Sequence, residues 1–244
     1  MSYMDDRDKD IVISKYVNRY QKFGIDVATL NSGGSGKQYI RHSVHTSMFD
    51  LAGKHVLDVG CGIAMFYEFL RHKSIPIASY TGIDIMEIFI ESNKQRFPEA
   101  SFHLVDIFKD SLEPYQTDVV FMSQVFNHRY DFSDNEVVAK EAINRLFQIA
   151  RVGLVIDFMT SYVDYNEDYL YYFSPEKMFG YAKSLTRLAA IRHDYLPFEF
   201  SLFLYKQPTY DLAEATQRAQ ALAAPSDPSA GQPSSPAPDE SRPS

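Results

Sequence analysis

Apolar residues follow two different patterns along this chain, and the two patterns alternate. Short apolar runs, typical of buried strands, are followed by segments with apolar residues every three to four positions, typical of helices. We expect strands at 56–59, 78–84, 101–106, 117–122 and 152–158, and helices at 64–70, 87–97, 134–149 and 175–184. This alternation predicts an α/β fold with a mainly parallel sheet.

Further elements precede and follow this series. Helices are expected at 10–23, ending at Gly24, and at 37–51, after a flexible glycine-rich turn at 31–36. They would cap the sheet. Two strands at 185–195 and 198–205 predict a hairpin at the sheet edge. We therefore expect one domain over 1–208, with cap helices at about 10–51 and a core over 53–208.

The last part of the chain differs in composition. Residues 224–244 hold six of the chain's 12 prolines, together with Ser, Ala, Gly and charged residues. Such a segment buries too little apolar surface to fold alone. We expect the tail over 209–244 to be disordered, apart from an alanine-rich helix over 211–223.

Charge and composition narrow the class of protein. The net charge is −8 and no cluster of Lys and Arg is present, which argues against a nucleic-acid partner. No apolar run approaches the length of a membrane span. The single cysteine, Cys61, excludes an intrachain disulfide, and the acidic N-terminus lacks the features of a signal peptide. These features predict a cytoplasmic protein without a membrane partner and leave its oligomeric state open.

A glycine-containing turn links the first strand to the helix that follows it. Gly60 and Gly62 come directly after the strand, and such glycines adopt positive φ and let a ligand approach the main chain. A dinucleotide fingerprint would require glycine at position 65, where this chain has Met65. Asp58, two residues before the first glycine, favours a ligand with an ammonium or sulfonium centre over a pyrophosphate.

Three expected strands end in acids, at Asp58, Asp84 and Asp106. The intervals are 84 − 58 = 26 and 106 − 84 = 22 residues, about one strand plus one helix each. The carboxyl ends of adjacent parallel strands line one crevice, so the three carboxylates are expected to meet one ligand. Asp84 is placed to accept hydrogen bonds from ribose hydroxyls. Asp106 is placed to accept from the adenine amine, beside the N–H of Ile107, while Ile85 and Met86 would sandwich the ring.

The pattern D-x-G-x-G-x-A over 58–64 resembles the first motif of the class I S-adenosylmethionine-dependent methyltransferases, with Ala64 where a third glycine is usual. The resemblance extends over about 16–206. It includes the stretches 38–41, 80–85, 123–127 and 171–175, then 193–195 and 199–200. It implies a Rossmann-like seven-stranded sheet, mostly parallel, with an antiparallel last strand. It also implies S-adenosylmethionine as the cofactor.

The resemblance also suggests further site residues. Arg41, with Gln38 one turn away, is the candidate partner of the methionine carboxylate, the alternative being a surface arginine. Ser123, after the fourth strand, is expected at the cofactor. His128 is the candidate general base and Asn127 its neighbour at the methyl group; the alternative is a loop histidine with local hydrogen bonds. His42 and His45 lack a third ligand, so no metal is expected.

The tyrosines after the fifth strand allow two interpretations. They either line a pocket for a small, partly apolar molecule or bury the underside of the connection: Tyr162, Tyr165, Tyr169, Tyr171 and Tyr172. The sequence therefore predicts a methyltransferase that moves the methyl group of S-adenosylmethionine to an oxygen or nitrogen of a small molecule, by in-line displacement. One alternative is a catalytically silent binding or scaffold protein with the same fold. Another, a nicotinamide-dependent oxidoreductase, is weakened by Met65 and Asp58.

Overall fold

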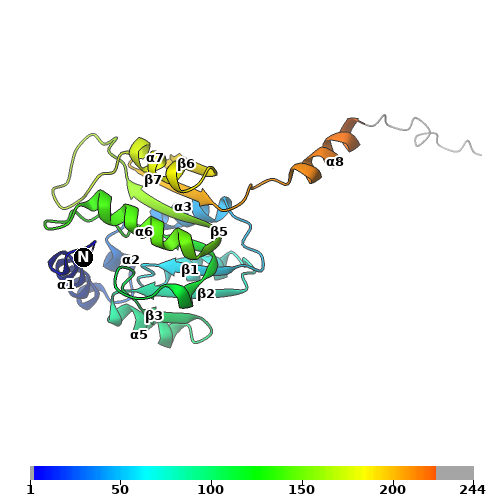
Figure 1. The fold of residues 1–244 in the computed structure, drawn as a ribbon. Helices are drawn as coiled ribbons and strands as arrows, with labels where there is room; N and C mark the ends of the chain where they lie inside the picture. Colours follow the sequence, from blue (N-terminus) through cyan, green and yellow to red (C-terminus); the bar gives the residue numbers. More distant parts are fainter. Residues whose placement is uncertain (1–2, 224–244) are drawn as a thin grey trace, which may run out of the picture. The chain divides into compact units, whose positions relative to one another are not determined.

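A single seven-stranded sheet forms the centre of the computed structural model, which describes residues 3–223 (Figure 1). The strand order is β3-β2-β1-β4-β5-β7-β6. The strands are β1 (His55–Val59), β2 (Ser79–Asp84), β3 (Ser101–Leu104), β4 (Thr117–Met122), β5 (Ala150–Met159), β6 (Ala189–Leu196) and β7 (Glu199–Tyr205). β7 runs antiparallel to both of its neighbours, whereas the other adjacent pairs are parallel. The predicted sheet with an antiparallel last strand is confirmed.

Helices cover both faces of this sheet. They are α1 (Asp6–Phe23), α2 (Val27–Leu30), α3 (Gly34–Ser47), α4 (Met65–His72), α5 (Glu87–Arg96), the 3₁₀ turn η1 (Glu113–Tyr115), α6 (Asn135–Ile149) and α7 (Pro175–Leu185). α6 and α7 pack into one buried cluster, and α6 crosses in front of the strands in Figure 1. α3, α4 and α5 contribute to the cluster on the other face. The two helical layers follow from strands that are apolar on both faces.

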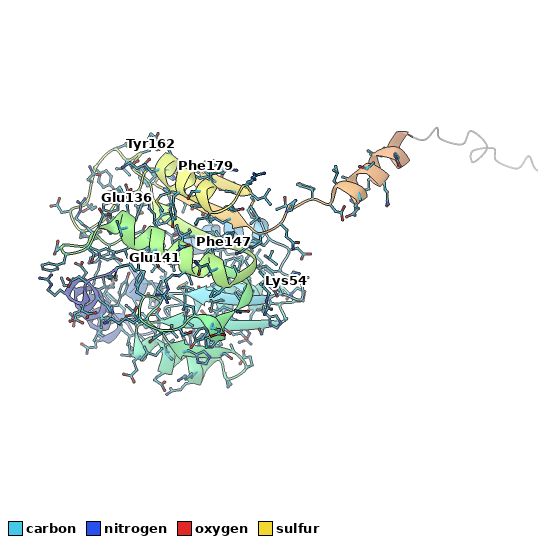
Figure 2. All side chains as sticks on the ribbon, in the orientation of Figure 1. Lys54, Glu136, Glu141, Phe147, Tyr162 and Phe179 are labelled. Atoms are coloured by element: carbon cyan, nitrogen blue, oxygen red, sulfur yellow. The ribbon has the colours of Figure 1, made fainter. Side chains whose placement is uncertain are left out.

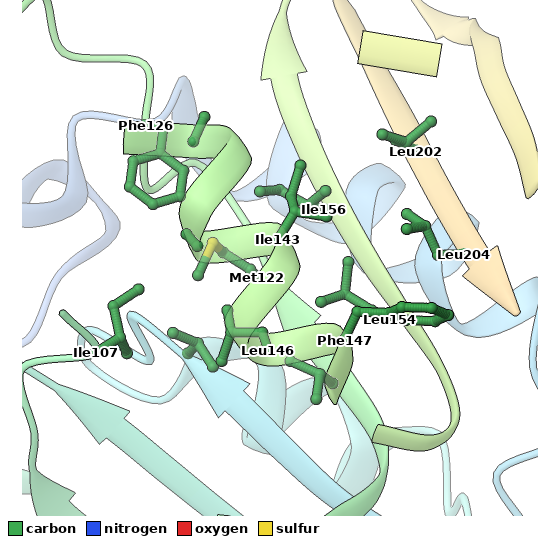
Figure 3. Packing of buried hydrophobic residues seen from close by; sticks show 14 of the residues in the cluster. Ile107, Met122, Phe126, Ile143, Leu146, Phe147, Leu154, Ile156, Leu202 and Leu204 are labelled. Carbon is green, nitrogen blue, oxygen red and sulfur yellow. The ribbon is translucent and has the colours of Figure 1, made fainter. Parts of the chain in front are cut away.

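The cluster under α6 shows how the sheet is stabilised. Ile143 and Leu146 of α6 are fully buried against Leu154 and Ile156 of β5 (Figure 3). Burying each such side chain contributes about 2 kcal/mol relative to exposure to water. Farther along, Glu136 accepts hydrogen bonds from lysines of α6 and α7, at the start of α6 (Figure 2). The central strands are therefore held rigid behind the loops at their carboxyl ends.

Polar side chains define where several helices begin. Asp5 accepts a hydrogen bond from the N–H of Arg7, and Asp134 accepts one from the N–H of Val137. Ser174 caps α7 as the sequence predicts. Gly24, at φ 61°, ends α1, also as predicted. α1 itself starts four residues earlier than expected, because its polar first turn carries no apolar periodicity.

Some boundaries were wrong. α3 occupies Gly34–Ser47 rather than 37–51, so the second half of the expected flexible turn is helical. The reason is tertiary: Gln38 and Arg41 are buried and both contact Ser32, which fixes the turn in front of the helix. β3 ends at Leu104, so Asp106 lies two residues beyond the strand. The four-residue helix α2 was not predicted, since it is too short to show a period.

Pro208–Ser244 separates from Met1–Gln207 as a second unit. It contains α8 (Leu212–Ala223), which confirms the alanine-rich helix and limits the disorder predicted for 209–244. The rest of that prediction, over 224–244, falls outside the described residues. Among residues 3–223, no helix has both the length and the apolar character needed to span a membrane.

Candidate functional site

A cleft of about 980 Å³ opens at the carboxyl ends of β1, β2 and β4. Parallel strands end at the same edge of a sheet, so the loops that follow them face one another there. Lys9, Val12 and Tyr16 of α1 line the cleft from the other side. Seven of the nine predicted cofactor residues line it: Gly60, Gly62, Asp84, Ile85, Asp106, Ile107 and Ser123.

The turn after β1 has the conformation that its glycines permit. Gly60 and Gly62 have φ of 71° and 51°. A Cβ on Gly60 would lie 2.5 Å from Cγ2 of Val125, so a larger residue does not fit. Ala64, in place of a third glycine, also adopts a left-handed φ of 59°, which costs about 1 kcal/mol for an L-residue.

Four of the five backbone N–H groups at 60–64 are already engaged, and that of Ile63 is the exception in the described chain. The N–H groups of Gly60 and Cys61 donate to the carbonyl of Ile83, at 2.8 and 3.1 Å. The N–H of Gly62 donates to Asp84, and the N–H of Ala64 to Cys61. A pyrophosphate needs free N–H groups at such a turn. The turn therefore suits a ligand that presents donors or positive charge.

Asp84, at the end of β2, lies in the cleft wall with both carboxylate oxygens anchored. One oxygen accepts from the N–H of Gly62 and the other from the N–H of Met86, both at 2.9 Å. Burial raises the pKa of Asp84 to about 6, and these two hydrogen bonds oppose the rise. Each oxygen keeps a further lone pair for a ligand hydroxyl.

Asp106 lines the same cleft beside Ile107 and forms an ion pair with Lys9 of α1. Its other oxygen accepts from the N–H of Phe108 at 3.0 Å. Asp6 of α1 pairs with Lys109, so two ion pairs tie α1 to the loop after β3. The expected acid is in place, but a basic residue of the cap helix already neutralises it.

Asp58 does not line the cleft, contrary to prediction. Successive side chains of a strand point to opposite faces, so Val59 reaches the cleft and Asp58 faces away from it. Its carboxylate accepts a hydrogen bond of 2.5 Å from the hydroxyl of Tyr80. Burial raises the pKa of Asp58 to about 7. The structure places Asp58 beneath the turn as a support.

Asp157 of β5 organises the loop after β4. It is fully buried and accepts from the hydroxyl of Ser123 at 2.5 Å and from the backbone N–H of Gln124 at 2.7 Å. Gln124 adopts a left-handed φ of 60°, which these contacts hold in place. Because its proton is given to Asp157, the hydroxyl of Ser123 can only accept from a ligand.

Arg41 is fully buried, and most of its guanidinium is engaged. Nε and Nη2 donate to the two carboxylate oxygens of Glu199 at 2.5 and 2.7 Å, and Nη2 also donates to the carbonyl of Ser32. The predicted bidentate contact with a ligand carboxylate is therefore wrong, because Glu199 occupies that side of the group. Nη1 remains, buried and without a hydrogen-bond partner in the described chain.

A second pocket of about 760 Å³ adjoins the cleft. The two share part of their lining: Val12, Tyr16, Leu30, Ser32, Gln124 and Val125. Arg41, Asn127 and His128 line the second pocket. The structure thus brings both predicted catalytic residues next to the predicted cofactor residues.

The two predicted catalytic residues differ in how free they are. Asn127 donates to the side chain of Gln124 at 2.8 Å and accepts from the N–H of Met159 at 2.9 Å, so both ends of its amide are engaged. His128 is half-buried, with Nδ1 3.4 Å from Nζ of Lys15. Burial, followed by the charge of Lys15, lowers the pKa of His128. The imidazole is therefore neutral at neutral pH.

The tyrosines after β5 divide between the two interpretations. Tyr169 lines the second pocket. Tyr171 packs against the core, with its ring 4.8 Å from that of Phe173. Tyr162 is exposed on the loop near α7, where it donates to Glu176 (Figure 2).

Sequence reasoning missed several lining residues: Lys9, Lys15 and Tyr16 of α1, and Glu199 of β7. Lys9 and Tyr16 are seven positions apart, which puts them on one helix face. The sequence shows that spacing, but it does not show that this face of α1 packs over the cleft. Among the residues of 3–223, no group of three or more His, Cys, Asp or Glu side chains is arranged to hold a metal ion.

One family model matches part of the chain. Residues 57–151 match the family described as "Methyltransferase domain". Over this span the chain is similar to a methyltransferase domain. The match covers the turn after β1, the acids after β2 and β3, and the loop after β4. A search of curated protein sequences gave no match.

Solved structures of methyltransferases share the fold of this chain at low sequence identity. An S-adenosylmethionine-dependent methyltransferase from Clostridium acetobutylicum ATCC 824 is 11% identical, with a TM-score of 0.53 over 79% of this chain and 98% of that one. One from Archaeoglobus fulgidus is 16% identical, with a TM-score of 0.53 over 71% and 95%. The plantazolicin methyltransferase BpumL, in complex with SAH, is 17% identical, with a TM-score of 0.51 over 84% and 93%. At these identities the likeness shows the fold alone.

The lining of the cleft fits S-adenosylmethionine, on which the neighbours from Clostridium acetobutylicum and Archaeoglobus fulgidus depend by name. Positive-φ glycines leave room for close approach, and the engaged N–H groups of the turn disfavour a phosphate. Asp84 offers acceptor lone pairs to hydroxyls. The residues present are therefore those that a cationic, ribose-containing ligand requires.

Proposed function

We propose that this protein transfers the methyl group of S-adenosylmethionine to an oxygen or nitrogen of a small molecule. One observation carries the proposal: the cofactor cleft and the second pocket meet at Gln124, with the neutral imidazole of His128 in the second pocket. A ligand in each pocket would bring a methyl donor and an acceptor together.

The cleft offers distinct contacts for each part of the cofactor. Asp84 is proposed to accept hydrogen bonds from the ribose hydroxyls, and Asp106 from the adenine amine beside Ile107. Ile85 and Met86, which line the cleft, would pack against the ring. Hydrogen bonds from a ligand to an ionised carboxylate contribute about 1.5–3 kcal/mol each.

The methionine end is proposed to lie toward the shared wall. Ser123, whose proton is given to Asp157, would accept from the ammonium group. Nη1 of Arg41 is the remaining donor at this wall for the carboxylate, in a single contact rather than a bidentate one. Asp58, which accepts a hydrogen bond from Tyr80 outside the cleft lining, makes no direct contact with the cofactor in this proposal.

When bound, S-adenosylmethionine would supply a methyl group on a positively charged sulfur. The lone pair of the acceptor would form the new bond to the methyl carbon, and the electron pair of the broken carbon–sulfur bond would remain on the sulfur. The protein must align the acceptor and exclude water. A hydroxyl acceptor also loses a proton, which a ring nitrogen of His128 takes up in this proposal. The rigid loop held by Asp157 fixes the wall along which the two ligands meet.

Calorimetric titration of the full chain with S-adenosylmethionine, with NADH in parallel, tests the cofactor assignment. We expect heat with the first ligand alone. The variant Asp84→Ala is expected to weaken binding about 100-fold, because two hydrogen bonds to a carboxylate are lost. Asp84→Asn keeps the shape and should weaken binding less.

Glu91→Ala serves as the matched control, since Glu91 is an exposed acid of α5 whose ion pair with Lys94 lies on the surface. Wild-type affinity in Asp84→Ala would contradict the ribose assignment. Cofactor binding without release of S-adenosylhomocysteine on any acceptor tried would instead support a non-catalytic binding protein. If His128→Ala kept full turnover on an active acceptor, the assignment of the base would be wrong.

A further inference from the structure

Lys15 is a half-buried cation in the second pocket without an acidic partner. Its Nζ lies 3.4 Å from Nδ1 of His128 and 5.0 Å from the ring centre of Tyr169. Within residues 3–223, no carboxylate lies within the 4 Å of an ion pair to it. Burial and the nearby charge of Arg19 lower the pKa of Lys15. A partly desolvated ammonium in this position is stabilised when a ligand supplies negative charge.

The other charges of the pocket point the same way. Three cations line it, namely Lys15, Lys37 and Arg41, against one acid, Glu199. Arg41 neutralises Glu199 through its two hydrogen bonds. The charge that faces a ligand is therefore positive.

About half of the remaining walls are apolar or aromatic: Val12, Tyr16, Leu30, Val125, Met159, Tyr169 and Leu170. The polar wall residues are Asn31, Ser32, Gln124, Asn127 and His128. Flat, apolar molecules gain most from such walls, because aromatic rings pack well against one another and against aliphatic side chains. The pocket thus combines apolar wall patches with a half-buried cation, Lys15, whereas Lys37, its other cation without an ion pair in the described chain, is exposed. A compact monoanion would neutralise Lys15 one for one.

We propose that the methyl acceptor is a small aromatic carboxylate that carries a hydroxyl or amino group, and that Lys15 pairs with its carboxylate. This inference rests on the proposed methyl transfer. The hydroxyl or amino group faces the shared wall at Gln124, where its lone pair forms the bond to the methyl carbon. When Lys15 turns to the carboxylate, it leaves Nδ1 of His128, which then accepts the proton that the acceptor loses.

The test uses the full chain saturated with S-adenosylhomocysteine. The probes are 4-hydroxybenzoate, 3-hydroxybenzoate, salicylate and anthranilate, each compared with its own carboxamide by calorimetry. We expect at least one acid to bind about ten-fold or more tightly than its amide. The preferred acid should then release S-adenosylhomocysteine when the chain is given S-adenosylmethionine instead.

Variants of α1 test whether Lys15 causes the preference for the acid over its amide. Lys15→Met is expected to abolish the acid-over-amide preference while affinity for the amide stays unchanged, and Lys15→Arg should restore part of it. Lys22→Met is the matched control, because Lys22 is an exposed lysine of the same helix and should leave the preference intact.

The outcomes separate this inference from the proposed function. Failure of S-adenosylhomocysteine to bind would contradict the proposed function itself. Binding of S-adenosylhomocysteine with no acid preferred over its amide, or with no probe bound up to about 10 mM, would overturn the acceptor class alone. An unchanged preference in Lys15→Met would overturn the role of Lys15.

Discussion

The cofactor cleft and the second pocket are adjacent but are assembled in different ways. The cleft uses residues at the ends of successive strands, such as Gly60, Asp84 and Asp106, in the order in which the chain supplies them. The second pocket joins α1, α2, α3, three loops, β5 and β7, and its ion pair between Arg41 and Glu199 spans 158 positions. A binding site built from the ends of successive strands can be predicted from a sequence, whereas one built from segments far apart in the sequence cannot.

The two regions also differ in charge. The cleft presents Asp84 and Asp106, with Lys9 as a counter-charge. The second pocket presents Lys15, together with the unpartnered nitrogen of Arg41. A cationic ligand suits the first and an anionic ligand suits the second, because opposite charges favour each other in a partly desolvated site.

The largest expected effect concerns the ion pair under the second pocket. Arg41→Met or Glu199→Gln should each lower the free energy of unfolding by about 3–5 kcal/mol. Either change leaves the other member of the pair buried without its ion-pair partner. The double variant should lose less than the sum of the two. Urea unfolding followed by circular dichroism measures this. The exposed pair Arg71–Glu99 is the control: Arg71→Met should cost under about 0.5 kcal/mol. Costs below about 1 kcal/mol in both buried variants would contradict the comparison.

A smaller effect concerns Asp58, beneath the cleft. Burial raises the pKa of Asp58 from 3.8 to about 7, so the folded protein binds the proton more tightly than the unfolded chain does. The stability that this proton contributes is full below pH 3.8 and is lost as pH rises through about 7. Asp58→Asn should remove this decline, which we expect to be at most about 4 kcal/mol. Urea unfolding at a series of pH values checks it.

The exposed loop acid Asp164 provides the control for that series, and Asp164→Asn should leave the pH profile of stability as in the wild type. A profile in Asp58→Asn that still falls with rising pH as steeply as in the wild type would show that another group carries the decline.

The smallest effect concerns the tie between α1 and the cleft. Lys9→Met removes the ion pair with Asp106 and should lower the free energy of unfolding by about 1 kcal/mol or less, since the pair is only partly buried. Thermal unfolding measures it. Lys22→Met, on an exposed part of the same helix, should have no effect. A loss as large as that of Arg41→Met would mean that α1 is as integral to the fold as the buried ion pair.

The structure brings predicted site residues into the cleft where a side chain's direction follows from its own strand end. Asp84 and Asp106 lie in the cleft because each follows a parallel strand. Asp58 was predicted to face the ligand, but its neighbour Val59 faces the cleft instead. Successive side chains of a strand point to opposite faces, and no local signal shows which face will line the cleft. Arg41 was assigned a ligand because its partner, Glu199, lies in a strand that the chain reaches much later.

The sequence by itself determined the alternation of strands and helices, the parallel sheet with its hairpin, and the glycine turn that admits a cofactor. These depend on periodicity and on residue types within about ten positions of one another. The tertiary structure alone decided that α1 closes the cleft, that Glu199 neutralises Arg41, and that Lys15 faces the second pocket without an acidic partner. Those outcomes depend on which distant segments pack together. The interaction between two charged side chains depends on the distance between them, and packing sets that distance.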